Sequence, residues 1–137
     1  MRKITEIIIH CAATPNGKEF HNTDIDRWHK ERGWQGIGYH YVICVDGDIE
    51  PGRTIETVGA HAQGHNAHSI GICMIGTDKF TNKQWKSLGE LVFELIGKFP
   101  DAAVIGHREV SPKTCPGFDV RIWWADGGMP DDGHILK

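Results

Sequence analysis

Two histidines and one cysteine stand where short strand-like segments end, and their side chains could together hold a metal ion. His10 ends the apolar run that starts at Glu6, and His107 directly follows the segment Ala103–Gly106. Cys115 comes eight positions after His107, in a loop bounded by proline and glycine. Two imidazoles and a thiolate suit Zn²⁺, and three protein ligands leave the fourth tetrahedral position for water. The residue types favour a catalytic zinc site, although the spacing alone leaves metal binding open.

The size and composition of the chain are those of one folded domain. It has 137 residues, of which 39% are hydrophobic and 24% charged, and this suits a single core. The formal net charge of -3 gives no support for a nucleic-acid partner. No apolar stretch approaches the roughly 20 residues of a membrane span, so no membrane partner is expected. The cysteines Cys11, Cys44 and Cys73 lie in apolar runs, where buried free thiols are ordinary.

The elements that must position these side chains alternate between strands and helices. Capping and periodicity predict helices from Asn22 to Gly33, from Thr81 to Phe99 and from Phe118 to Ala125. Strands are expected at Glu6–Cys11, Tyr39–Val45, Ile49–Glu50, Ile70–Gly76 and Ala103–Gly106. The last two strands flank the long helix, which predicts a right-handed crossover and a parallel pair. The expected fold is α/β: a single domain (1–125) with a central mixed sheet flanked by helices, then a loosely ordered tail (126–137).

Several ordered motifs resemble the type 2 N-acetylmuramoyl-L-alanine amidases, a family that includes phage lysozymes of amidase type and is related to peptidoglycan recognition proteins. The resemblance covers nearly the whole chain, from about Ile7 to Trp124. The motifs that carry it are Ile9-His10-Cys11-Ala12-Ala13-Thr14, Trp28-His29-Lys30 with Gly33-Trp34, Gly38-Tyr39-His40-Tyr41, Gly59-Ala60-His61-Ala62, Gly106-His107-Arg108-Glu109 and Lys113-Thr114-Cys115-Pro116-Gly117-Phe118-Asp119.

The resemblance implies roles for particular residues and a particular reaction. His10, His107 and Cys115 would be the zinc ligands, with Tyr39 and Lys113 as catalytic partners. The implied substrate is peptidoglycan, cut by a zinc-activated water at the amide between N-acetylmuramic acid and the L-alanine of the stem peptide. The resemblance also implies His61 as a substrate-groove residue, for which a place in a polar surface loop with His65 and His68 is the alternative. Arg53, which follows Pro51-Gly52, is expected to line the groove apart from the resemblance, and a solvated surface position is the equal alternative.

Two other functions are compatible with the same fold. One is a non-catalytic peptidoglycan receptor, against which the presence of both Cys115 and Lys113 argues. The other is a regulatory protein that binds a phage or host RNA polymerase. The N-terminus, Met1-Arg2-Lys3-Ile4, lacks the long apolar segment of a secretory signal. We therefore expect synthesis in the cytoplasm, action on the cell wall after release, and a monomer.

Overall fold

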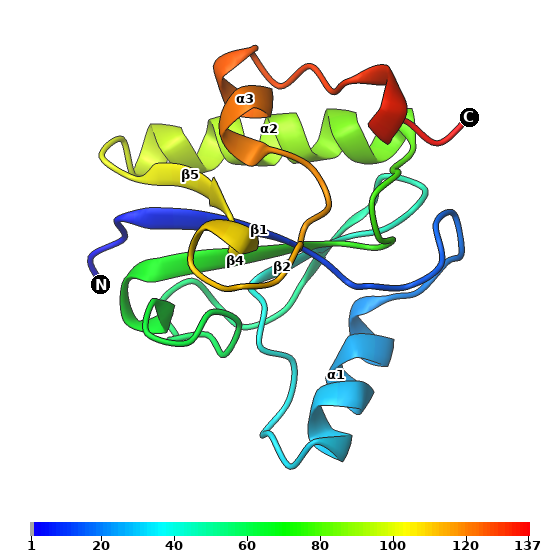
Figure 1. The fold of residues 1–137 in the computed structure, drawn as a ribbon. Coiled ribbons are helices and arrows are strands. Elements are labelled where there is room, and N and C mark those ends of the chain that lie inside the picture. The colour runs from blue at the N-terminus through cyan, green and yellow to red at the C-terminus, as the bar shows by residue number, and fades with distance from the viewer. Residues whose placement is uncertain (1) are drawn as a thin grey trace.

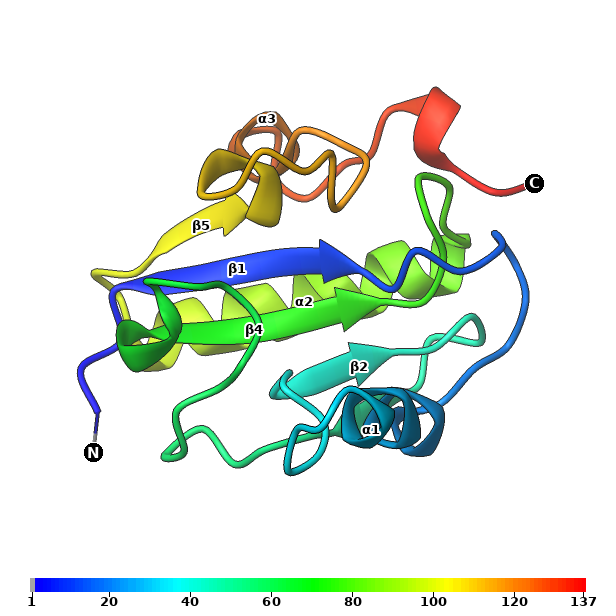
Figure 2. The same cartoon turned by 60° about the horizontal axis from the view of Figure 1, so that its bottom comes forward.

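The computed structural model describes residues 2–137 and is built on one five-stranded sheet with the order β3-β2-β4-β1-β5. β2, β4, β1 and β5 run parallel to one another (Figure 2). β3 is antiparallel to β2, so the predicted mixed α/β fold is confirmed. The strands are β1 (Glu6–Cys11), β2 (Tyr41–Ile43), β3 (Ile49–Pro51), β4 (Ser69–Met74) and β5 (Ala103–Gly106). The helices are α1 (Asn22–Glu31), α2 (Asn82–Lys98) and α3 (Val120–Ala125), with short 3-10 turns η1 (Asn66–His68), η2 (His107–Glu109) and η3 (Asp132–His134).

The first strand of the chain lies between the two strands that the long helix connects. β4 and β5 are parallel, as predicted, but the prediction that they pair directly is wrong, because each pairs with β1 instead. The register sets Ile9 of β1 beside Ile72 on one side and Gly106 on the other. Ile7, Ile8 and Ile9 are fully buried, which fits a strand with neighbours on both edges and side chains covered on both faces.

Helix α2 covers one face of the sheet (Figure 1) and supplies five of the seventeen buried side chains of the main core. It begins with the predicted capping box: Gln84 N donates to Thr81 Oγ1 at 3.2 Å, and Thr81 N donates to Gln84 Oε1 at 3.0 Å. Its buried stripe packs against alternate residues of β1 and β4 and includes Trp85, Leu88, Val92 and Leu95. Each such side chain contributes about 1.5–3 kcal/mol through burial. Within the described part of the chain, no helix has both the length and the hydropathy needed to cross a bilayer.

The opposite face of the sheet is covered only in part, because α1 packs over the β2 side (Figures 1 and 2). Ile25 of α1 belongs to a smaller core with Val42, Cys44 and Cys73. Register places Val42 beside Cys73 and Cys73 beside His10. The side chain of His10 therefore lies on the face that α1 leaves partly open, and a cleft can form there.

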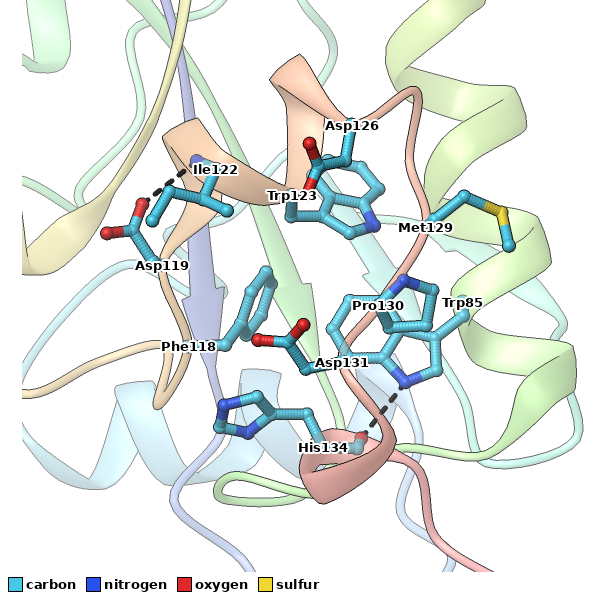
Figure 3. A pocket seen from close by; sticks show the side chains of 10 residues that line it. All are labelled: Trp85, Phe118, Asp119, Ile122, Trp123, Asp126, Met129, Pro130, Asp131 and His134. Carbon is cyan, nitrogen blue, oxygen red and sulfur yellow. Dashed lines mark hydrogen bonds between the residues drawn. The ribbon is translucent and has the colours of Figure 1, made fainter.

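The C-terminal tail is attached to the start of α2. Phe80 N donates to His134 O and Leu136 N donates to Phe80 O, both at 2.9 Å, and Trp85 Nε1 donates to His134 O at 3.0 Å (Figure 3). The tail was expected to be loosely ordered, whereas these bonds anchor it to the domain. The pocket between the tail, α2 and α3 is about 40 Å³, room for very few water molecules, so it is no substrate site.

Candidate metal centre and catalytic cleft

The predicted metal ligands line a cleft of about 660 Å³ on the face of the sheet that α1 leaves open. His10 is 1% exposed, whereas His107 and Cys115 are half-buried. Tyr39 and Lys113 line the same cleft. The structure thus brings together the five residues that the resemblance assigned to zinc binding and catalysis.

Parallel pairing of β1 and β5 places the two histidines side by side. Ile9 pairs with Gly106, so the residues that follow them, His10 within β1 and His107 directly after β5, lie side by side with ring centroids 4.4 Å apart. Cys115 returns to this point because Arg108 N donates to Cys115 O at 2.7 Å. The backbone N–H of Cys11 donates to the Cys115 sulfur at 3.1 Å. One donor atom from each of His10, His107 and Cys115 lies within 4.8 Å of the others.

The chemistry of these three donors fits a zinc ion. Ligand atoms around tetrahedral Zn²⁺ are about 3.3–3.8 Å apart, given bond lengths of about 2.0–2.3 Å, so small side-chain shifts would suffice. Burial above all, and then nearby positive groups including Lys113, lower the pKa of both His10 and His107, which keeps them neutral as metal ligands must be. The neighbouring Cys11 thiol and burial raise the pKa of Cys115, so a thiolate there calls for a cation.

Tyr39 and Lys113 approach the ligands from different loops. Tyr39 precedes β2, and its ring centroid is 5.0 Å from that of His10. Burial, and then the thiols of Cys73 and Cys115, raise the pKa of Tyr39 well above its ordinary value, so its hydroxyl keeps its proton at neutral pH. Lys113 is exposed at the mouth of the cleft. The cleft thus combines a neutral hydroxyl donor with an exposed lysine.

His61 lines the cleft, as expected of a groove residue, but it also contacts a predicted zinc ligand. Its Nδ1 lies 2.9 Å from His10 Nε2, and its Nε2 lies 3.1 Å from Ser69 Oγ. The ring rests over Gly71 of β4, where an added Cβ would come within 2.6 Å of it. A side chain at position 71 would displace His61, so the glycine makes room for this contact.

Arg53 and His29 differ from their expected placements. The guanidinium of Arg53 donates to the backbone carbonyls of Ile37 and Val58, both at 2.8 Å, so it braces loops and is not among the residues that line the cleft. His29 was expected only as a helix residue, but it lines the cleft, and its Nδ1 accepts from Gly38 N at 3.0 Å. A helical position next to Trp28 carries no signal that could have revealed this contact.

Comparisons with known proteins agree with the geometry. The N-acetylmuramoyl-L-alanine amidase family profile matches residues 1–118. The endolysin of Escherichia phage T7 is 43% identical over 126 residues, covering 86% of this chain and 83% of the relative. The amidase LysC from Clostridium intestinale superposes with a TM-score of 0.80 at 35% identity, covering 88% of this chain and 81% of that one. Drosophila PGRP-LB gives 0.81 at 27% identity over 100% and 87% of the two chains. The chain therefore belongs to the N-acetylmuramoyl-L-alanine amidase family of peptidoglycan hydrolases.

Proposed function

We propose that this protein is a zinc-dependent amidase that hydrolyses the bond between the lactyl group of N-acetylmuramic acid and the first L-alanine of the stem peptide. The observation that carries the proposal is the convergence of His10, His107 and Cys115 within 4.8 Å in a cleft of about 660 Å³. A cleft of that volume is within the usual range for ligand sites. Family membership supports the substrate class, and the donor set supports the metal.

His10, His107 and Cys115 would hold the zinc ion. When bound at such a site, zinc supplies Lewis acidity toward a carbonyl oxygen and lowers the pKa of water from 15.7 to about 7. The neutral imidazoles offer lone pairs without first losing a proton, and the thiol of Cys115 must release its proton to solvent. The backbone N–H of Cys11 donates to the Cys115 sulfur and favours its negative charge.

Tyr39 and Lys113 would act on the reacting groups. The Tyr39 hydroxyl, which keeps its proton, can hydrogen-bond the attacking water and orient it toward the carbonyl carbon. Lys113 carries a positive charge that can meet the oxyanion formed when water adds to the amide. Loss of one such oxyanion donor typically lowers the rate about 10²- to 10³-fold. The exposed position of Lys113 lets it approach the substrate after binding.

Digestion of purified muropeptides followed by mass analysis tests the proposed bond. We expect the products to be a free stem peptide with an N-terminal L-alanine and a saccharide that ends in an intact lactyl group. Activity should disappear on chelation and return with added zinc, and Cys115→Ser should bind less zinc at this site. Products in which the lactyl–alanine amide survives while another bond is cut would contradict the proposal.

A further inference from the structure

A second group of metal-binding side chains lies away from the cleft, where α1 begins beside the β2–β3 hairpin. His21 directly precedes α1, Cys44 directly follows β2, and Glu50 is the middle residue of β3. His21 Nδ1 lies 3.0 Å from Glu50 Oε2 and 3.7 Å from Cys44 Sγ, and Cys44 Sγ lies 3.2 Å from Glu50 Oε1. Glu19 brings a further carboxylate within 4.8 Å of the His21 and Cys44 donors. Two segments distant in sequence, the start of α1 and the β2–β3 hairpin, therefore converge here.

The separation of His21 and Cys44 matches that between two ligands of one tetrahedral ion, and the contacts of Glu50, at 3.0 and 3.2 Å, are slightly shorter. For Zn–N near 2.0 Å and Zn–S near 2.3 Å, a nitrogen–sulfur edge is about 3.6 Å, and the His21–Cys44 separation is 3.7 Å. Backbone N–H groups also hold the two carboxylates, since Glu50 Oε1 accepts from Asn22 N at 2.8 Å and Glu19 Oε1 accepts from Val45 N at 3.2 Å. An ion at the centre of the group would take the place of the side-chain contacts among His21, Cys44 and Glu50.

The local charge also favours a cation. Cys44 is 0% exposed, and burial, followed by the carboxylates of Glu50, Glu19 and Asp46, raises the pKa of its thiol. The ion pair of Glu50 is with His21, and no lysine or arginine among residues 2–137 forms an ion pair with Glu50 or Glu19. A soft thiol beside an imidazole and two carboxylates suits zinc or cobalt better than magnesium or calcium.

We propose that His21, Cys44, Glu50 and Glu19 bind a second, structural zinc ion. Binding releases the Cys44 thiol proton to solvent, and the thiolate, the Nδ1 lone pair of His21 and one oxygen from each carboxylate become the ligands. Four protein ligands close the coordination shell and leave no position for a substrate. The ion would fasten the start of α1 to the β2–β3 hairpin, so it acts on stability and leaves the chemistry to the cleft.

The placement gives this ion an indirect link to the cleft wall. α1 carries His29, whose Nδ1 accepts from the backbone N–H of Gly38, the residue before Tyr39. Ile25 of the same helix packs on the small core that contains Cys44. An ion that fixes the first turn of α1 would therefore limit the motion of the wall that holds Tyr39.

Zinc counting on four variants tests the site separately from the catalytic one. After dialysis against zinc and removal of the excess, we expect two ions on the unchanged chain, one on Cys115→Ser, one on Cys44→Ser, and none on the double variant. With cobalt in place of zinc, Cys115→Ser should keep a sulfur-to-metal absorption band that the double variant lacks. His65→Gln is the matched control, because His65 pairs with Glu6 in a separate His/Glu group and should leave the count unchanged.

The outcomes distinguish this proposal from the proposed function. The second site would be overturned if Cys115→Ser bound no zinc. It would also be overturned if His65→Gln lowered the zinc count and Cys44→Ser did not, and both results would leave the amidase proposal intact. If the chain bound zinc at the Cys44 site but did not cleave muropeptides, the amidase proposal alone would be contradicted. His21→Gln provides a check that does not alter the buried thiol: its zinc count should also fall by one. Added zinc should raise the melting temperature of Cys115→Ser and not that of the double variant.

Discussion

His61→Ala should weaken zinc binding in the cleft, although His61 is not among the proposed ligands. Nε2 of His10 lies 2.9 Å from His61 Nδ1. Because Nε2 is engaged in this contact, His10 would bind the metal through Nδ1, and its proton would then be on Nε2. In that tautomer His10 Nε2 would donate to His61 Nδ1, and His61 would in turn donate from Nε2 to Ser69 Oγ, which lies 3.1 Å away. The chain of bonds fixes the ring of His10 in one tautomer and one orientation.

The magnitude follows from what the contact provides. Loss of a partner that orients a ligating histidine typically costs about 10- to 100-fold in metal affinity, or about 1.4–2.8 kcal/mol. The effect should lie toward the upper part of this range, because His10 is 1% exposed and water has little access to replace the lost acceptor. His61→Gln keeps an acceptor oxygen and should recover part of the affinity.

Competition with a chromophoric chelator measures this affinity directly, without reference to turnover. To isolate the cleft site, the measurement belongs in a Cys44→Ser background. His68→Ala is the matched control, since His68 lies in the same loop but bonds Glu6, and it should bind zinc like its parent. If His61→Ala bound zinc as tightly as its parent while losing activity, His61 would act on the substrate and its positioning role would be refuted.

Four further changes test other parts of the structure. Tyr39→Phe should retain zinc and lose most turnover in a muropeptide assay, because only the hydroxyl is removed; full activity would exclude its role. Lys113→Ala should lower kcat about 10²- to 10³-fold, and unchanged kcat would exclude the oxyanion role. Burial lowers the pKa of His29 to about 4 and that of His61 to about 3. Below the ordinary histidine pKa of about 6.5, the unfolded chain therefore binds protons at these two residues that the folded chain does not bind. Urea unfolding of the metal-free chain should therefore show about 2 kcal/mol less stability per histidine at about pH 5 than at about pH 7.5, and equal stability would contradict these shifts. Trp85→Phe removes the bond to the tail and should cost about 1–2 kcal/mol in the same assay, whereas an unchanged midpoint would mean that the tail is held by other contacts.

Local signals predicted the elements better than their arrangement. The Thr81 and Gln84 capping box and the apolar stripe after it predicted α2, since both depend on residues three or four positions apart. The insertion of β1 between β4 and β5 could not be predicted in the same way. Pairing partners are chosen by long-range packing, and three consecutive buried isoleucines show only that the strand is central.

Within the site, the sequence predicted the residues whose side chains are typical metal ligands. It did not predict the contacts that depend on how distant segments pack. The side chains of His10, His107 and Cys115 are common zinc ligands, and the motif resemblance assigned this role to them. The contact of His61 with His10 depends on an empty space over Gly71 in another strand, which no nearby sequence pattern encodes. Arg53 has the same charge whether it meets a substrate or a carbonyl, so its two hydrogen bonds to the backbone could not be anticipated.

The rigidity of the proposed zinc site derives from the core on the other side of the sheet. Side chains of a strand alternate between faces, so Ile9 points into the α2 core while His10, the next residue, points into the cleft. A shift of β1 by one residue would place either Glu6 or the His10 imidazole in the α2 core, with Ile8 taking the other position there. Since Ile7, Ile8 and Ile9 are all fully buried, such a shift would remove one isoleucine from its buried position, at a cost of about 1.5–3 kcal/mol, and would bury a polar side chain under α2. The same packing that stabilises the fold therefore fixes the position of His10, and weakening it should loosen the metal before the domain unfolds.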